Sequence, residues 1–326
     1  MLQDRLELFA SNAQIVRRKF IWHHILTQRM VALIYSQEGR TIEHEKIRDC
    51  LNMIKKNTGV FSSFRGNMAL CIAALLSLSE NPQELLEETL NVYGLLKNVK
   101  FRASDFLVIA ALEIAKQTTP DNYESVVDRA RQFYDGMKAF SFFHTGHDDY
   151  IFSAMLGLSD LDVKDGVSRI NQIYDRLKDE FWSKNSVQAL AQILVLSGAD
   201  DGIDRILVYR NALREQKIKL DKTYTLSSLG VLSLLPVEID VVVRDMNDAK
   251  RYLRSQKGFS SFSVSTQELL LYTVAVVANE YAQNIKDGVL TATLSTSIAN
   301  IIIAQQMAMI AAITASRAAA AASHSS

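Results

Sequence analysis

Glycine and proline are scarce in this sequence of 326 residues. It holds 13 glycines and 3 prolines, about 5% of the chain, whereas average usage of the two together is about 12%. Collagen-like chains, disordered chains and turn-rich all-β folds need many more of these residues. Their scarcity excludes those classes and favours regular elements joined by short connections.

Surplus charge and cysteine are scarce as well. Lysine plus arginine number 36, and so do aspartate plus glutamate, so the formal net charge is zero. Non-specific binding of nucleic acid depends on a surplus of Lys and Arg that neutralises phosphates, so we do not expect a nucleic-acid partner. Cys50 and Cys71 form neither a CxxC pair nor a metal-ligand spacing. We therefore expect two reduced, buried thiols in a cytoplasmic protein.

One segment raises the question of a membrane. Residues 288–316 carry no charge and are long enough to cross a bilayer, but Thr, Ser, Asn and Gln interrupt them. They also lack a Trp or Tyr at either end, so membrane insertion is less favoured than a buried or self-associating helix. A homo-oligomer joined through this helix is one consequence of that reading. The acidic start of the sequence does not resemble a signal peptide, which again favours a cytoplasmic location.

A pattern of about forty residues recurs along the chain. Apolar runs end at Ser79, Ser159 and Ser197, and a Y-x-x-[LM]-K motif recurs beside them. Each unit then holds an apolar helix, a short polar connector and an amphipathic helix. One such hairpin does not bury its own apolar face, so neighbouring hairpins must stack. The predicted units are 61–98, 99–140, 141–181, 182–220 and 221–258.

The predicted fold class is therefore all-α, with repeated helical hairpins of about 40 residues forming an α/α superhelix or toroid. Residues 1–58 form an N-terminal cap of two helices, 59–285 the hairpin repeats, and 286–326 an apolar C-terminal helix with an Ala/Ser-rich tail. The long first helix is expected to carry His23 and His24 as packing or surface residues. Phenylalanines near the unit starts are expected to pack between successive hairpins. They are Phe61, Phe64, Phe140, Phe142, Phe143, Phe259 and Phe262.

Three segments resemble a known family. These are Phe61-Ser62-Ser63-Phe64-Arg65-Gly66-Asn67 with the apolar run behind it, Thr145-Gly146-His147-Asp148-Asp149, and the Ala-rich ending. They are similar to an uncharacterised bacterial domain-of-unknown-function family, number 4003. The resemblance covers nearly the whole chain. It implies no activity, cofactor or catalytic residue.

Basic residues recur where the apolar helices are expected to begin. Each lies at or just before a position predicted to cap such a helix, and helix N-termini favour anions. The positions are Asn67, Ser104, His147, Asn185 and Thr223, of which all but His147 are good N-cap residues, and the basic residues are Arg65, Arg102, His144, Lys184 and Lys222. This rim is predicted to bind an acidic protein or a small anionic ligand. The alternative is that these side chains only cover helix ends and pair with acids such as Asp105.

The densest cluster on this rim is His144, His147, Asp148 and Asp149. Two imidazoles and two carboxylates could ligate a divalent metal, yet the acids also complement a helix dipole and no second ligand cluster is visible. We therefore predict no metal site, and no cofactor or catalytic residue is assigned. The candidate ligand-binding residues are Arg65, Asn67, Arg102, Asp105, His144, His147, Asp148, Asp149, Lys184 and Lys222.

Common catalytic motifs are missing from the sequence. It shows no Walker loop, dinucleotide-binding glycine motif, HExxH or nucleophile elbow. The favoured function is an interaction or scaffold module with a protein or small anionic ligand as partner, and a membrane partner is not favoured. The alternative is a small-molecule enzyme or ligand-binding protein, such as a metal-dependent hydrolase, which uses the same rim.

Overall fold

The computed structural model describes residues 2–140, 145–198, 202–286, 307–308 and 310–313. Every regular element within these ranges is a helix and none is a strand, which confirms the all-α class. His144, Phe142, Phe143 and most of the predicted segment 286–326 lie outside these ranges. No helix in this part of the chain combines the length and the hydropathy that a bilayer crossing requires.

Apolar and amphipathic helices alternate along the chain. The apolar helices are α2 (Ile25–Gln37), α4 (Ala69–Leu78), α6 (Asp105–Gln117), α8 (Tyr150–Leu158), α10 (Lys184–Ser197), α12 (Leu226–Ser233) and α14 (Thr266–Lys286). The amphipathic helices are α1 (Leu2–Lys19), α3 (His44–Asn57), α5 (Pro82–Asn98), α7 (Tyr123–Phe140), α9 (Val163–Leu177), α11 (Gly202–Glu215) and α13 (Ile239–Ser255). Short 3-10 turns occur at η1 (Ser63–Arg65), η2 (Pro120–Asn122) and η3 (His147–Asp149).

The chain divides into two compact units. Of the described residues, the first unit takes those within Met1–Gln14, Ser36–Thr41 and Ser168–Gln306. The second unit takes those within Ile15–Tyr35, Ile42–Val167 and Met307–Ser326. Helices α1, α2 and α9 therefore contribute residues to both units.

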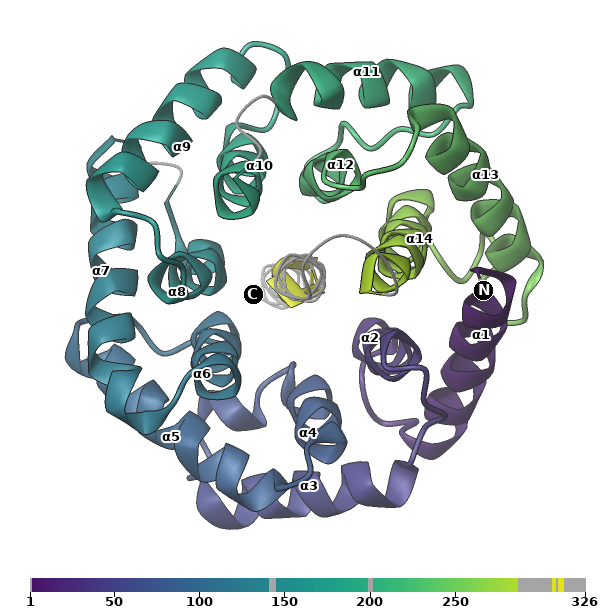
Figure 1. Ribbon diagram of the computed structural model, residues 1–326. Helices are drawn as coiled ribbons and strands as arrows, with labels where there is room; N and C mark the ends of the chain where they lie inside the picture. Colours follow the sequence, from purple (N-terminus) through teal and green to yellow (C-terminus); the bar gives the residue numbers. More distant parts are fainter. Residues whose placement is uncertain (1, 141–144, 199–201, 287–306, 309, 314–326) are drawn as a thin grey trace, which may run out of the picture. The chain divides into compact units, whose positions relative to one another are not determined.

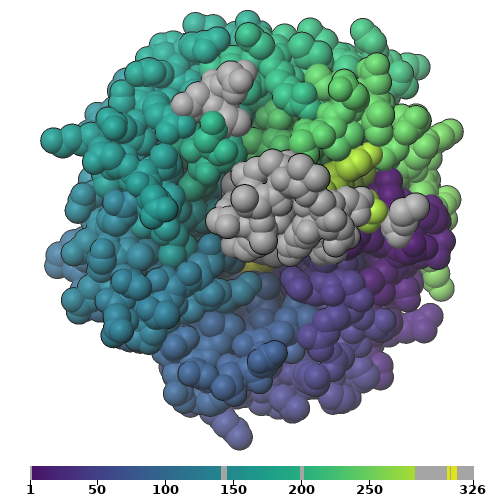
Figure 2. All heavy atoms as spheres, viewed as in Figure 1, coloured from purple at the N-terminus to yellow at the C-terminus, as the bar shows by residue number. Residues whose placement is uncertain are grey.

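The second unit consists of two layers of helices. The apolar helices α4, α6 and α8 form one layer, and the amphipathic helices α3, α5 and α7 form the other (Figure 1). Almost every side chain of α4 and α6 is buried, because these helices are apolar around most of their circumference. Side chains fill the gaps that the ribbon leaves between the helices of this unit (Figure 2). In the first unit, α10, α12 and α14 pack in the same way against α11 and α13.

Two arginines bind the connectors between helices in the same manner. The Arg129 guanidinium on α7 donates to three backbone carbonyls at and beyond the end of α8. Arg205 on α11 does the same at the end of α12 in the first unit. In both cases the acceptors follow the arginine by 28, 30 and 32 residues. The acceptors are Gly157, Ser159 and Leu161 for Arg129, and Ser233, Leu235 and Val237 for Arg205.

The N-terminal region differs from the prediction of two helices before residue 58. It contains three, because α1 ends at Lys19 and α2 begins only at Ile25. His24 Nδ1 accepts a hydrogen bond from the Leu26 amide at 3.2 Å and so starts α2. The Gln28 side chain donates to the Phe20 and His23 carbonyls, both at 2.8 Å. These contacts hold a turn that contains neither glycine nor proline.

The prediction that phenylalanines at the unit starts pack between hairpins holds for only some of them. Phe64 and Phe259 are buried, and Phe64 packs edge-on against Tyr93 with ring centroids 5.2 Å apart. Phe61 and Phe262 are fully exposed, and Phe140 is about half exposed, so the prediction was wrong for these three. Each F-S-S-F segment places one of its two phenylalanines in the core and leaves the other in solvent.

Both cysteines are free and buried, as predicted. Burial raises the pKa of Cys50 to about 11 and raises the pKa of Cys71 still further, so both remain thiols at neutral pH. In the described part of the C-terminal segment, the side chains at 307, 308, 310 and 311 are buried too.

Candidate functional site

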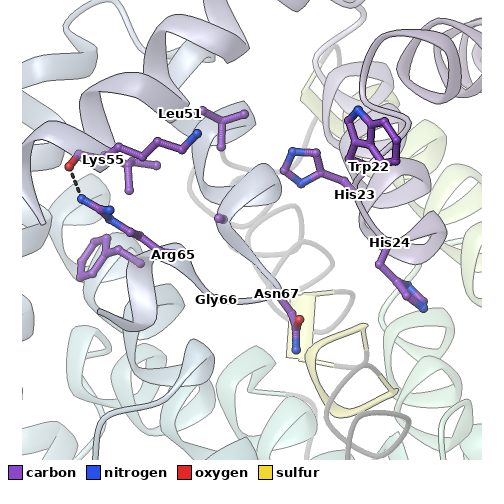
Figure 3. Close-up of a pocket in the computed structure, with 11 residues that line it drawn as sticks. Trp22, His23, His24, Leu51, Lys55, Arg65, Gly66 and Asn67 are labelled. Atoms are coloured by element: carbon purple, nitrogen blue, oxygen red, sulfur yellow. Dashed lines mark hydrogen bonds between the residues drawn. The ribbon is translucent and has the colours of Figure 1, made fainter. Parts of the chain in front are cut away.

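A cavity of about 270 Å³ lies in the second unit, where two connectors meet helix α3 (Figure 3). The first connector joins α1 to α2, and the second joins α3 to α4. A volume near the lower limit of small-molecule pockets, about 300 Å³, suits a small ligand or one chemical group of a larger ligand. The lining residues are Trp22, His23, His24, Leu51, Ile54, Lys55, Phe64, Arg65, Gly66, Asn67 and Ala69.

Arg65 holds the second connector against the end of α3. Its guanidinium donates to the backbone carbonyls of Lys55 and Thr58, and its Nε donates to the Thr58 hydroxyl at 3.2 Å. These carbonyls lie at the end of the helix and receive no hydrogen bond from within it, so the arginine supplies the donors that they lack. The predicted candidate Arg65 thus lines the cavity while it closes a helix end.

Lys55 and His23 approach the cavity from opposite sides. The Lys55 amine and the His23 ring point toward one another, whereas His24 points away (Figure 3). Burial and the positive charge of Lys55 lower the pKa of His23 below its ordinary value of 6.5. His23 is therefore mainly neutral at pH 7, and it keeps a hydrogen-bonding nitrogen beside a cation.

The described lining is cationic and rich in donors. Lys55 and Arg65 supply two positive charges, and Asn67 and His23 supply polar nitrogens. No carboxylate stands among the residues that line this cavity in the described part of the chain. Charge-assisted hydrogen bonds from ammonium and guanidinium groups are the usual means of holding phosphate or carboxylate. The arrangement can therefore bind an anionic group.

Asp105 lies behind the second connector. It is the first residue of α6, and its carboxylate accepts a hydrogen bond from the Asn67 backbone N–H. Gly66 makes this approach possible, because a Cβ at that position would overlap the carboxylate. Burial raises the pKa of Asp105 to about 6 although the hydrogen bond from Asn67 favours the charged form. The predicted candidates Asn67 and Asp105 are thus brought together, whereas the guanidinium of Arg65 is bonded to the end of α3.

A second group of predicted residues meets at the start of α8. The His147 ring lies against Tyr150 with centroids 5.1 Å apart, and the Tyr150 hydroxyl accepts a hydrogen bond from the Arg102 backbone N–H at 3.3 Å. Partial desolvation by neighbouring atoms lowers the pKa of His147, the charge of Arg102 lowers it further, and the charge of Asp148 opposes them. Arg102 and His147 are both exposed.

Asp149 has a structural partner in the same turn. Its Oδ2 accepts a hydrogen bond from the Gly146 backbone N–H at 2.8 Å, and its side chain is buried. The contact fixes the turn η3 that leads into α8. In the ranges that the structure covers, no three His, Cys, Asp or Glu side chains group in a way that could hold a metal ion. His144, the fourth member of the predicted cluster, lies outside those ranges.

Lys184 and Lys222 belong to the first unit. Lys184 Nζ donates to the Lys178 backbone carbonyl just after α9 and lies 3.7 Å from an Asp179 carboxylate oxygen. The Lys222 side chain is exposed, and its backbone carbonyl accepts hydrogen bonds from the first turn of α12. The prediction that both bind an anion stays a prediction.

Of the four predicted N-caps, only Ser104 is the N-cap of an α-helix. Its hydroxyl accepts a hydrogen bond from the Leu107 amide at 3.2 Å, and α6 begins at the next residue. The helices α4, α10 and α12 have Met68, Ser183 and Thr225 at the N-cap position, and His147 begins a 3-10 turn. The predicted caps Asn67, Asn185 and Thr223 were therefore wrong. The connectors differ by a residue or two, which shifts each helix start away from a constant register.

Among the residues that line the cavity, sequence reasoning named only Arg65 and Asn67 as candidates, and the residues it missed include Trp22, His23, His24 and Lys55. The two histidines were placed inside a helix, and Lys55 lies on α3, far in sequence from the first connector. One signal was present. Residues 15–24 contain three basic residues and two histidines with no Asp or Glu.

The comparisons with known proteins identify a family. A model of the family described as "Protein of unknown function (DUF4003)" matches residues 12–307. This match spans most of the chain, so the chain belongs to that family, and the resemblance drawn from its sequence is confirmed. No match was found among curated proteins or among solved structures.

Proposed function

We propose that this member of the DUF4003 family is an interaction module that binds an anionic group, with the cavity between the two connectors and α3 as its site. The observation that carries the proposal is the lining: Lys55, Arg65 and Asn67 face a small cavity without a carboxylate among the described lining residues. A phosphate or carboxylate there would meet the Lys55 ammonium and the positive charge of Arg65, whose Nε and one terminal nitrogen already donate to Thr58 and Lys55.

The proposal extends to the helical architecture. We propose that the alternating helices are repeated hairpins of an α/α superhelix or toroid. The matching carbonyl contacts of Arg129 and Arg205 support this, because they recur 76 residues apart, close to two units of about forty residues. In such proteins the connectors at one end of the stack commonly supply the binding surface.

The enzyme alternative receives less support. A metal-dependent hydrolase on the rim would use Asp148 and Asp149, but the Asp149 carboxylate is buried and accepts the Gly146 amide. A carboxylate that fixes a turn in this way is poorly placed to ligate a metal or to take a proton from water.

Trp22 offers a direct test of anion binding. The chain has two tryptophans, so a Trp182→Phe background leaves Trp22, which lines the cavity, as the only indole. Inorganic pyrophosphate is the probe, and we expect a saturable change in Trp22 fluorescence. Lys55→Gln should weaken binding about tenfold, the scale of one lost charge-assisted hydrogen bond.

The matched control is Lys56→Gln. Lys56 is exposed on the same helix but does not line the cavity, so its loss should leave the pyrophosphate affinity nearly unchanged. Absence of saturable binding by fluorescence and by calorimetry would overturn the proposal. Equal weakening by the two lysine variants would overturn the assignment to this cavity.

A further inference from the structure

Four large apolar side chains protrude from the two connectors that form the cavity. Trp22 is 92% exposed and Phe61 102%, with their neighbours Ile21 and Val60 at 61% and 74%. The two connectors meet at the cavity, so their exposed apolar side chains are candidates for a surface that another molecule covers. Phe20 and Phe64, from the same connectors, are buried and anchor each one to the core. Each connector thus has an aromatic anchor and an apolar tip.

The two sequence segments that carry these tips are strongly basic. The tips lie in two segments, residues 15–24 and 50–68, which contain no Asp or Glu although the whole chain is neutral. Three basic residues end α1, and two more lie in the last turn of α3, so each connector directly follows a basic turn. The nearby carboxylate of Asp105 is buried against Gly66 and Asn67. The six basic residues of the two segments are Arg17, Arg18, Lys19, Lys55, Lys56 and Arg65.

Protruding apolar tips beside cations match the surface of an anionic bilayer. Indole and phenyl rings partition to the boundary between headgroups and acyl chains, and exposed Lys and Arg are attracted to anionic lipids. Binding to such a surface strengthens with the apolar area that enters it and with electrostatic attraction to anionic lipids, and these segments offer both contributions. A free anion would occupy the cavity but would leave the four apolar tips in water.

We infer that the second unit docks on an anionic lipid bilayer, with Ile21, Trp22, Val60 and Phe61 entering the interface and the cavity receiving a headgroup phosphate. The inference rests on the proposed function, because it names the anionic group as part of a lipid. It is compatible with the sequence argument against a membrane, which concerned a crossing by residues 288–316. Docking by two connectors requires no spanning helix.

Vesicle binding of the full chain tests the inference. Vesicles of phosphatidylcholine with about one third phosphatidylserine provide an anionic surface, and pure phosphatidylcholine is the neutral comparison. We expect co-sedimentation with the anionic vesicles only, and it should weaken steeply with added salt. In the Trp182→Phe background, Trp22 emission should shift to the blue, and lipids brominated on the acyl chain should quench it.

Two double alanine variants give the decisive comparison, because each removes two exposed aromatic side chains from a different unit. Trp22→Ala with Phe61→Ala should reduce vesicle binding at least tenfold. Trp182→Ala with Phe262→Ala, which removes tips 95% and 104% exposed in the first unit, should leave it unchanged. Because all four side chains are in solvent, neither double variant should change the helical circular dichroism signal. Equal effects of the two double variants would overturn the inference.

The outcomes separate this inference from the proposed function. Binding of pyrophosphate without binding of anionic vesicles overturns the lipid inference and leaves the proposed function standing. If poly-glutamate binds in a way that depends on Trp22 and Phe61 while vesicles do not bind, the partner is an acidic protein and the inference fails. Vesicle binding that Lys55→Gln weakens, and that pyrophosphate reduces by competition, supports both.

Discussion

Asp105 is expected to make the stability of this protein depend on pH in an unusual direction. Its carboxylate is buried at the start of α6, where the Asn67 backbone N–H donates to it. Burial raises its pKa from the ordinary value of 3.8 to about 6. Asp105→Asn keeps the shape and an acceptor oxygen but removes the charge.

The direction of this pH dependence is set by the state of the chain, folded or unfolded, that binds the Asp105 proton more tightly. The folded chain holds the Asp105 proton more strongly than the unfolded chain, so this group stabilises the fold below pH 3.8. That stabilisation is lost as the pH rises to about 6, and above pH 6 the buried charge opposes folding. An ordinary salt-bridged aspartate has the reverse effect.

The shift in the pKa of Asp105 sets an upper limit on its contribution to the free energy of folding. A rise in pKa from 3.8 to about 6 corresponds to at most about 3 kcal/mol, at 1.36 kcal/mol for each pH unit. Partial exposure of the carboxyl reduces this to about 1–2 kcal/mol. Loss of an acidic group from the first turn of α6 subtracts about 0.5 kcal/mol. We therefore expect Asp105→Asn to stabilise the protein by about 1 kcal/mol at about pH 7.5 and to give no gain near pH 4.

Urea unfolding followed by circular dichroism at 222 nm measures this difference. The midpoint of Asp105→Asn should exceed that of the wild type at the higher pH and match it or fall below it at the lower pH. Asp121→Asn, at an exposed aspartate of η2, controls for the loss of a surface carboxylate. If Asp105→Asn is no more stable than the wild type at the higher pH, or differs from it equally at both, the reasoning about Asp105 is refuted.

Three further predictions follow from the same structure. Gly157→Ala should lower the free energy of unfolding in urea by about 2–3 kcal/mol, because the added Cβ would lie 2.7 Å from the Val126 carbonyl oxygen. Gly94→Ala has open space around the added Cβ and should raise that free energy by about 0.4–1 kcal/mol. Equal effects of the two variants would contradict the packing of α7 on α8. Arg129→Met and Arg205→Met should each cost about 2–4 kcal/mol by the same measurement, and a large difference between them would count against the repeat. The pKa of His23 is lowered in the free protein, and an anion in the cavity would favour its protonated form. Pyrophosphate should therefore bind more tightly at about pH 5.5 than at about pH 7.5 in fluorescence titrations. The His23→Asn variant should remove this difference.

The helices could be predicted because their signals are local. Apolar and amphipathic runs alternate at helical spacing, and short polar connectors separate them. The turn between α1 and α2 was missed because it contains no glycine or proline, and the side chains of His24 and Gln28 hold it from within α2 and its start. A helix end that depends on the side chains of the next helix leaves little trace in local composition.

The site was predicted only in part, for a different reason. Arg65 and Asn67 were found because they belong to one short connector next to an apolar helix. His23 and Lys55 face each other only after folding brings the first connector against α3, and neither lies in a recurrent pattern. The local pattern thus indicated one wall of the cavity. The opposite wall depends on tertiary packing.

Net neutrality in this chain conceals a local separation of charge. The two connector segments carry six basic residues and no acid, so the rest of the chain must carry a matching negative surplus. An anion therefore has a preferred place to bind on a molecule that as a whole does not attract it. The exposed tips Trp22 and Phe61 lie in these basic segments, which ties the apolar and the electrostatic signals to the same two connectors. A mixed apolar and basic surface of this kind favours a partner that is itself anionic at its face and apolar beneath, and a bilayer of anionic lipids has that structure.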